Sequence, residues 1–188
     1  MSTAKHKTFC QCITGPGGVT QWDKLDFTVH VINHPPGWAL NSIDRFVWLE
    51  LQRVQKHTSL MFELRNNVAD INLSFVPMDG HSGTLGRAWY PSFSTTDNGR
   101  IQMDIAEDWT EDRLRLVFLH ELLHALGLRH SEDDRDVMYP YMITDRPFLS
   151  PNDIRRLQAI FGDPPRPLPT PPRPCGFWCR LLRLFRWR

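Results

Sequence analysis

The sequence predicts an α+β fold, because runs that alternate between apolar and polar residues occur together with runs of helical periodicity. The alternating runs indicate β-strands over residues 26–32, 70–75, 84–89 and 100–105. Helical spacing and capping residues indicate helices that begin near Asn41, Glu111 and Ser150. The 188 residues have room for one such domain with extensions, and a hydrophobic content of 41% can supply its core.

Each of the three helices is marked by a different signal. The first carries one apolar stripe, which is typical of a helix packed against a core. The stripe consists of Ile43, Phe46, Val47, Leu51 and Val54. The second is expected from Glu111 to Leu128, with Gly127 close to its end. The third opens with a capping box, in which Ser150 is the N-cap, Pro151 occupies the first turn and Asp153 completes the pair.

The two ends of the chain differ from this body in composition. Residues 1–19 are expected to form a leader and residues 20–162 the folded domain. Residues 163–174 include seven prolines and predict a stiff linker, and residues 175–188 form a tail. Up to residue 162 the chain has 16 Lys+Arg and 20 Asp+Glu, a net charge of −4, and the remainder carries +5. A mildly acidic body therefore precedes a basic end, which favours an acidic partner for the tail, such as a membrane surface.

The four cysteines, Cys10, Cys12, Cys175 and Cys179, all lie near the ends of the chain. A core held by disulfides would place cysteines inside the domain, so the body is expected to fold by burial and metal binding. The first residues lack the apolar stretch of a secretory signal, and no segment has the roughly eighteen apolar residues of a membrane-spanning helix. The sequence leaves the compartment open.

The motif that carries chemistry is H-E-x-x-H-x-x-G-x-x-H, which runs from His120 to His130. His120 and His124 are one helical turn apart, so both imidazoles can reach one metal ion. Gly127 allows a sharp exit from the helix, which can bring His130 back as a third ligand. Three protein ligands leave a fourth position open, as in catalytic zinc sites. Glu121 lies beside them and is the expected general base.

The alternative is a chance match of histidines on a buried helix. Five fixed positions at roughly 5% usage each would match in fewer than about one chain in ten thousand of this length, so the zinc interpretation is favoured. Met138 follows His130 by eight residues. After a complete motif, we interpret it as a Met-turn that forms a hydrophobic floor under the metal rather than as an ordinary core residue.

Together these residues resemble a matrixin, the catalytic domain of the matrix metalloproteinases within the metzincin clan. Further segments carry the resemblance over about residues 20–162: Trp22 with Lys24, Ala69–Asn72, Glu107–Thr110, Ser131 and Leu149–Ile154. The resemblance implies a zincin-like fold, with a twisted, mixed, mostly parallel five-stranded sheet and three helices. It also implies a zinc-dependent endopeptidase that cleaves extended protein substrates in the extracellular matrix.

The resemblance also bears on two further metal sites. The structural second zinc of matrixins is predicted to be absent, because Arg87 and Gln102 stand where the family has histidines and His81 alone cannot hold an ion. A calcium loop is expected, with an all-oxygen shell of the kind that calcium prefers. Its donors would be the carboxylates of Asp79, Asp104 and Glu107 and the carbonyls of Gly80, Ser82 and Thr84. The alternative is a solvated acidic turn.

The resemblance implies a substrate cleft. Its expected residues are Leu85, Gly86, Leu116, Pro140, Tyr141 and Met142. Leu85 and Gly86 would lie on an edge strand that pairs with the extended peptide. Leu116 would floor a deep S1′ pocket for a bulky apolar P1′ residue, although a helix leucine belongs to a core about as often as to a pocket.

Matrixins are typically kept inactive by a prodomain whose Pro-Arg-Cys-Gly thiolate occupies the open position on zinc. The leader is expected to be too short for such a prodomain, and it contains no such motif. Arg173-Pro174-Cys175-Gly176 occurs after the domain in a related order, so a thiolate from the tail is one hypothesis for latency. A cysteine without any such role is the alternative.

Residues 177–188 interleave arginine with leucine and aromatic residues at helical spacing, which predicts a cationic amphipathic helix of interfacial type. Cys175 and Cys179 could add acyl anchors. A disordered or partner-docking tail fits the pattern equally well. Nucleic-acid binding is not favoured, because no recognised fold accompanies the charge.

The sequence thus predicts a monomeric, single-domain, matrixin-like zinc endopeptidase. One rival is a catalytically silent zinc-containing binding module, against which the intact Glu121 argues. The other is a membrane-active peptide carried by an inert domain. Vesicle binding by the tail, without peptide cleavage by the domain, would favour the second rival.

Overall fold

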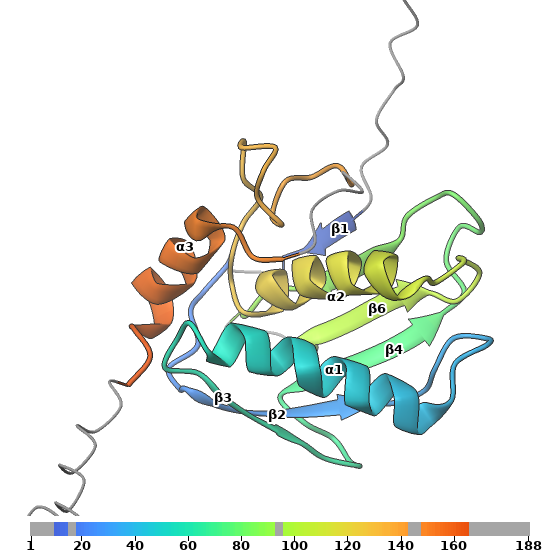
Figure 1. Ribbon diagram of the computed structural model, residues 1–188, viewed down its shortest axis with the longest axis horizontal. Helices are drawn as coiled ribbons and strands as arrows, with labels where there is room; N and C mark the ends of the chain where they lie inside the picture. Colours follow the sequence, from blue (N-terminus) through green and yellow to red (C-terminus); the bar gives the residue numbers. More distant parts are fainter. Residues whose placement is uncertain (1–9, 15–17, 93–95, 143–147, 166–188) are drawn as a thin grey trace, which may run out of the picture.

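The computed structural model describes residues 10–14, 18–92, 96–142 and 148–165, and within them one mixed sheet is covered by helices (Figure 1). The strands are β1 Cys10–Ile13, β2 Asp26–Val31, β3 Met61–Leu64, β4 Ile71–Val76, β5 Gly86–Trp89 and β6 Arg100–Asp104. The helices are α1 Leu40–Gln55, α2 Glu111–Ala125 and α3 Pro151–Phe161. None of these helices is long and apolar enough to cross a bilayer.

The strand order is β1-β5-β6-β4-β2-β3. β5 runs antiparallel to β6, and the other pairings are parallel. The predicted α+β class is confirmed, but the described sheet has six strands rather than five. The additional strand is β1, which comes from the segment expected to be a loose leader and forms one edge of the sheet.

Helices α1 and α2 lie across the same face of the sheet (Figure 1). The rings of Phe46 on α1 and Phe118 on α2 have centroids 6.4 Å apart. Arg115 on α2 lies 2.9 Å from the buried carboxylate of Glu50 on α1. The predicted stripe of α1 is buried throughout. Aromatic packing and a shielded ion pair therefore join the two helices above the sheet.

Helix α2 is buried along most of its length, from Leu114 onward, and it ends three residues before the predicted Leu128. The N–H of Leu128 donates to the Leu123 carbonyl, and the N–H of Gly127 donates to the His124 carbonyl, both at 2.8 Å. Gly127 has φ +108°. This is a Schellman ending, and it turns the chain away from the helix directly after the second histidine.

Helix α3 begins as predicted. The Ser150 side chain accepts hydrogen bonds from the Asn152 and Asp153 amides, and Asp153 completes the capping box. At the other end of the helix, the ring of Phe161 lies edge-on to Phe27 of β2, with centroids 6.3 Å apart. The helix is thus fixed at both ends, by its cap and by the core.

Candidate metal centre

His120 and His124 are fully buried on α2, and their Nε2 atoms lie 2.9 Å apart. The Nδ1 of His120 is 2.6 Å from the Val137 carbonyl, and the Nδ1 of His124 is 2.7 Å from the Leu128 carbonyl. A carbonyl oxygen can only accept, so each Nδ1 carries the proton. Each Nε2 then keeps its lone pair, which is the form of imidazole that binds a metal.

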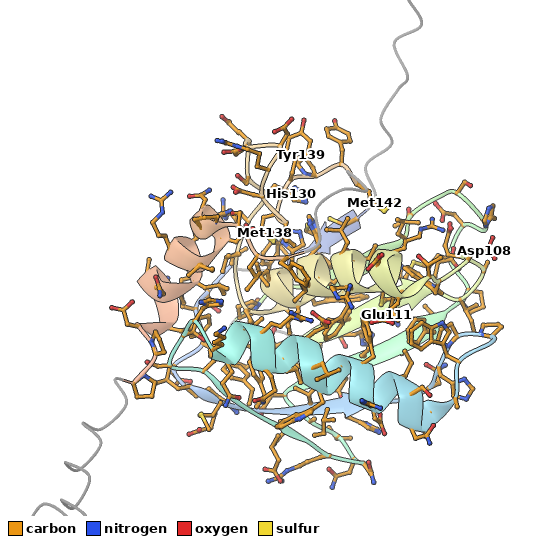
Figure 2. All side chains as sticks on the ribbon, viewed as in Figure 1. Asp108, Glu111, His130, Met138, Tyr139 and Met142 are labelled. Carbon is orange, nitrogen blue, oxygen red and sulfur yellow. The ribbon has the colours of Figure 1, made fainter. Side chains whose placement is uncertain are left out.

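His130 reaches the same point from the chain beyond Gly127. Its ring centroid lies 5.3 Å from that of His120 and 4.7 Å from that of His124. The neighbouring Ser131 amide donates to the carbonyl of Met138 at 2.9 Å, and Met138 is fully buried. Figure 2 shows His130 and Met138 together at the C-terminal end of α2. The structure therefore brings the three predicted ligands together, with the predicted Met-turn beside them.

Two cysteines of β1 lie against these histidines. The Sγ of Cys10 is 3.1 Å from the Nε2 atoms of His120 and His130 and 3.5 Å from that of His124. The Sγ of Cys12 is 3.0 Å from His124 Nε2 and 3.7 Å from His130 Nε2. The ligand atoms of Cys10 and the three histidines all lie within 4.8 Å of one another. Among the described residues, no other group of His, Cys, Asp and Glu side chains brings three ligand atoms this close together.

The donor set fits zinc, which takes imidazole nitrogen and thiolate sulfur in tetrahedral sites. Burial, and then the adjacent His124, hold the pKa of His120 well below its ordinary value, so its imidazole is neutral. The pKa of Cys12 is lowered mainly because its sulfur accepts a hydrogen bond from the Cys10 thiol. The pKa of Cys10 is raised by the hydrogen bond to Cys12 and by burial. One of the two sulfurs is thus held as a thiolate beside the histidines.

Glu121 is buried next to this cluster, and both of its carboxylate oxygens lack a hydrogen-bond partner among the described residues. Burial, and then the charge of Cys12, raise its pKa well above the ordinary value. A Cβ at Gly86 on β5 would come within 2.9 Å of the Glu121 Cγ, so the strand passes close to this side chain. Buried carboxylates without partners are costly, and they occur mainly where chemistry requires them.

Tyr90 is a further residue of the site that sequence reasoning assigned no role. Its hydroxyl lies 2.9 Å from the Nδ1 of His124, and the two rings meet edge to face with centroids 5.2 Å apart. Burial, and then the nearby Cys12, raise the pKa of Tyr90. Because the Nδ1 proton already points to the Leu128 carbonyl, the phenol oxygen shares that proton as a second acceptor.

Cys10 and Cys12 also received no role from the sequence. Their Cys-x-Cys spacing is a signal, since residues two apart on a strand share one face. Their contact with the histidines depends on the pairing of β1 with β5, which no local pattern reveals.

β1 covers the edge of β5 that was expected to pair with substrate. Cys10 pairs with Gly86 and Ile13 with Trp89 in parallel register, and the Tyr90 amide donates to the Ile13 carbonyl at 3.1 Å. Of the other expected cleft residues, Leu85 and Leu116 are buried, and Pro140, Tyr141 and Met142 are half-buried. An open cavity of about 710 Å³ remains beside Cys12 and His130.

At the positions where matrixins bind a second zinc, Arg87 and Gln102 face each other across β5 and β6. The Arg87 Nε donates to the Gln102 Oε1 at 2.8 Å. A guanidinium cation and a primary amide are not zinc ligands, so these residues do not fit that ion.

The three acids of the predicted calcium loop gather around residues 79–84, and each accepts from a backbone amide of the loop. The amides of Gly80, Ser82 and Thr84 donate to Asp104 at 3.2 Å, Glu107 at 2.6 Å and Asp79 at 2.9 Å, respectively. Arg113 lies 2.6 Å from Glu107. The loop therefore brings three carboxylates close to one guanidinium.

The tail for which a thiolate, acyl anchors and an amphipathic helix were predicted is not described by the structure. Cys175, Cys179 and residues 177–188 lie outside the described residues.

The sheet, the helix-borne histidines and the exit at Gly127 together have the architecture of the metzincin class. A family model described as Matrixin matches residues 21–162. The chain belongs to the matrixin family.

Several relatives of known name are similar to this chain. Human matrix metalloproteinase-27 is 33% identical over 170 residues, which cover 81% of this chain and 33% of the relative. Human matrix metalloproteinase-26 is 33% identical over 162 residues, or 78% of this chain and 61% of the relative. Interstitial collagenase of Oryctolagus cuniculus is 32% identical over 180 residues, which cover 88% of this chain and 37% of the relative. The chain thus spans about a third of the length of the first and third of these relatives.

Proposed function

We propose that this chain is a zinc-dependent metalloendopeptidase of the matrix metalloproteinase type, which hydrolyses peptide bonds in extended protein substrates. The observation that carries the proposal is the convergence of three imidazole Nε2 atoms beside a buried carboxylate without partners. His120, His124 and His130 would hold the ion, which when bound supplies a Lewis acid for the peptide carbonyl.

The chain's own residues supply the rest of the reaction. Glu121 takes a proton from the attacking water and delivers it to the leaving amine, and its raised pKa suits this exchange. The carbonyls of Val137 and Leu128 keep the imidazoles oriented by accepting their Nδ1 protons. Leu85 and Gly86 would align the peptide along β5 once that edge is free.

We also propose that the described conformation is a latent form. β1 pairs with the substrate edge, and it places the thiol of Cys10 rather than a peptide carbonyl at the histidine cluster. A bound thiolate would complete a four-coordinate site and exclude water. The strand therefore acts as an inhibitor and not as a substrate.

Turnover of a quenched collagen-like peptide tests both proposals. The zinc-loaded Cys10→Ser/Cys12→Ser variant is expected to hydrolyse the peptide at least tenfold faster than the wild type. Adding Glu121→Ala to that variant should lower the rate by about 10²–10⁴-fold at equal zinc content. Equal rates with and without Glu121 would exclude the catalytic proposal. If a thiolate from the tail blocked the metal centre instead, Cys175→Ser would raise the rate of peptide cleavage and the β1 variant would not.

We propose that the loop of residues 79–84 binds calcium together with Asp104 and Glu107, because the carboxylates gathered there exceed the nearby positive charge. Calcium at 100 times its Kd would stabilise the protein by about 2.7 kcal/mol. The expected rise in Tm is about 5–10 °C. Glu107→Ala should abolish this rise, whereas Asp108→Ala, which changes an exposed neighbour (Figure 2), should keep it. A Tm that does not respond to calcium would favour the solvated acidic turn.

We propose further that the domain comprises residues 20–162 and that its S1′ pocket selects a bulky apolar residue above Leu116, with Pro140, Tyr141 and Met142 as its wall. The buried position of Leu116 and the half-buried positions of the other three support this assignment. A peptide library varied at P1′ should show a preference for leucine and larger apolar residues. A preference for glycine or charged residues would contradict it.

The setting that we propose is extracellular, with the protein acting as a monomer and residues 177–188 resting on an anionic membrane surface. Co-sedimentation with vesicles containing phosphatidylserine tests the tail. The full chain should bind, and a variant with Arg180, Arg183, Arg186 and Arg188 changed to Gln should not. Equal sedimentation of the two would contradict the membrane assignment.

A further inference from the structure

We infer that Cys10 and Cys12 form a peroxide-sensitive dithiol, whose oxidation to a disulfide within β1 opens the metal centre. The inference rests on the latent form proposed above. It differs from a single blocking thiol, because it assigns the second sulfur a role of its own.

The first observation is the position of the two sulfurs. The Sγ atoms of Cys10 and Cys12 lie 3.5 Å apart on one face of β1, and both contact imidazoles of the cluster. Both cysteines are free thiols. Two thiols at this separation can join without bringing in a third partner from elsewhere in the chain.

The second observation is the difference in access. Cys10 is buried, with an exposed fraction of 4%, whereas Cys12 is half-buried and lines the open cavity of about 710 Å³. Arg129 and His130 line the same cavity. A small oxidant entering there meets Cys12 first, and Cys10 stands behind it as the resolving thiol.

Third, a disulfide strains the blocking strand and takes both sulfurs away from the metal centre. On an extended strand, residues two apart have their Cα and Cβ atoms about 6.4–6.8 Å apart. A disulfide accepts Cα atoms up to about 6.8 Å apart but needs Cβ atoms at about 3.5–4.5 Å. The two side chains would therefore have to turn toward each other by roughly 2 Å at the extended limit of the bond. This turn strains β1 along its register from Cys10–Gly86 to Ile13–Trp89. Oxidation therefore removes both sulfurs from the histidines and weakens the pairing with β5.

The chemistry needs a hydroperoxide as the two-electron oxidant. The Cys12 sulfur attacks one peroxide oxygen, the O–O bond breaks, and Cys12 becomes a sulfenic acid while the other peroxide oxygen takes up a proton and leaves as an alcohol or water. The Cys10 sulfur then attacks the Cys12 sulfur, the S–O bond breaks, and the oxygen leaves as water with the thiol proton. Two thiols and one hydroperoxide thus give one disulfide, one water and one alcohol or second water.

The test uses the full chain carrying Cys175→Ser/Cys179→Ser, so that the thiols of β1 are the only ones present, with Co²⁺ at the metal centre. The reduced protein should show a thiolate-to-cobalt charge-transfer band. Hydrogen peroxide should abolish the band, remove two hydrogen atoms from the peptide that contains both cysteines, and raise peptide cleavage to the rate of Cys10→Ser/Cys12→Ser. Dithiothreitol should reverse all three changes.

The matched control is Cys12→Ser in the same background, which keeps Cys10. It should lose its charge-transfer band at least tenfold more slowly in peroxide. Three results would each overturn the proposed dithiol switch. They are equal rates of band loss in the two proteins, the absence of a disulfide after peroxide treatment, and a band that persists after the disulfide has formed. A reduced parent without any charge-transfer band would overturn the latent form itself, whereas cleavage that depends on Glu121 would still stand.

Discussion

The Nδ1 proton of His124 lies between two acceptors, the Leu128 carbonyl at 2.7 Å and the Tyr90 hydroxyl at 2.9 Å. The motif made His120, His124, His130 and Glu121 predictable, because helix spacing and one glycine bring them together within eleven residues. Tyr90 was not predictable. Its contact depends on where β5 passes α2, and neither segment encodes that locally.

Tyr90→Phe tests this contact. Removing the hydroxyl leaves the Leu128 carbonyl as the remaining acceptor, so the ring of His124 should be less firmly oriented. We expect zinc affinity to fall by about tenfold, at the low end of such losses. Competition with a chromophoric chelator measures this, and the Cys10→Ser/Cys12→Ser background isolates the histidines from the thiols. An unchanged Kd would show that Leu128 alone orients the imidazole.

Among the secondary-structure elements, α3 contributes to the site without contacting it. The Asp153 carboxylate accepts from the amide of Val137 at 2.8 Å, and the carbonyl of Val137 holds His120. Asp136, next to Val137, accepts from the side chains of Ser131, Ser150 and Asn152. The cap of α3 and the predicted Met-turn are thus one hydrogen-bonded unit. The sequence revealed the cap but not its link to the histidine.

The acid dependence of stability should depend on this unit. Burial disfavours a charged Asp136, but hydrogen bonds from Ser131, Ser150 and Asn152 hold its pKa below the ordinary value. A pKa lower in the folded than in the unfolded state gives stability that is present above about pH 4 and is lost as the pH falls through the folded value.

Asp136→Asn should therefore destabilise the protein by about 1–3 kcal/mol at pH 7. It should also flatten the loss of stability below pH 4. Urea unfolding at a series of pH values measures both effects. The same acid slope in variant and wild type would show that Asp136 titrates alike in the folded and unfolded states.

The strands that sequence patterns missed are the two at the edges of the sheet. β3 has a single buried residue, Phe62, and Met61 is half exposed, so four residues give too little alternation to detect. β1 has a signal in its cysteines, but its role comes from pairing with a strand far away in the sequence. Edge strands are specified mainly by their neighbours, which explains why the inner strands were predicted and these were not.

For the molecule as a whole, the latent and open states differ by whether β1 completes the sheet. In the described state the Tyr90 amide donates to Ile13, and Thr20 donates to Pro91 just beyond, which holds the following chain in place. Release therefore concerns the short segment around β1 and leaves the β4–β6 ladder intact.

Hydrogen exchange can detect this release. In the Cys10→Ser/Cys12→Ser variant, amides in residues 86–90 should exchange faster than in the reduced wild type, because the strand no longer has a thiol to hold it at the metal. Amides in residues 71–76 should be unchanged and serve as the internal control. Equal exchange at residues 86–90 would show that backbone pairing alone holds β1.

We expect three histidines and one thiolate of β1 to share a zinc ion in the reduced chain. X-ray absorption at the zinc edge of the reduced chain measures this directly. We predict three nitrogen neighbours at about 2.0–2.1 Å and one sulfur at about 2.3 Å. In Cys10→Ser/Cys12→Ser the sulfur should be replaced by a light atom, and in Cys175→Ser/Cys179→Ser it should remain. A wild-type zinc shell without sulfur, or one whose sulfur is lost with the tail cysteines, would contradict the account.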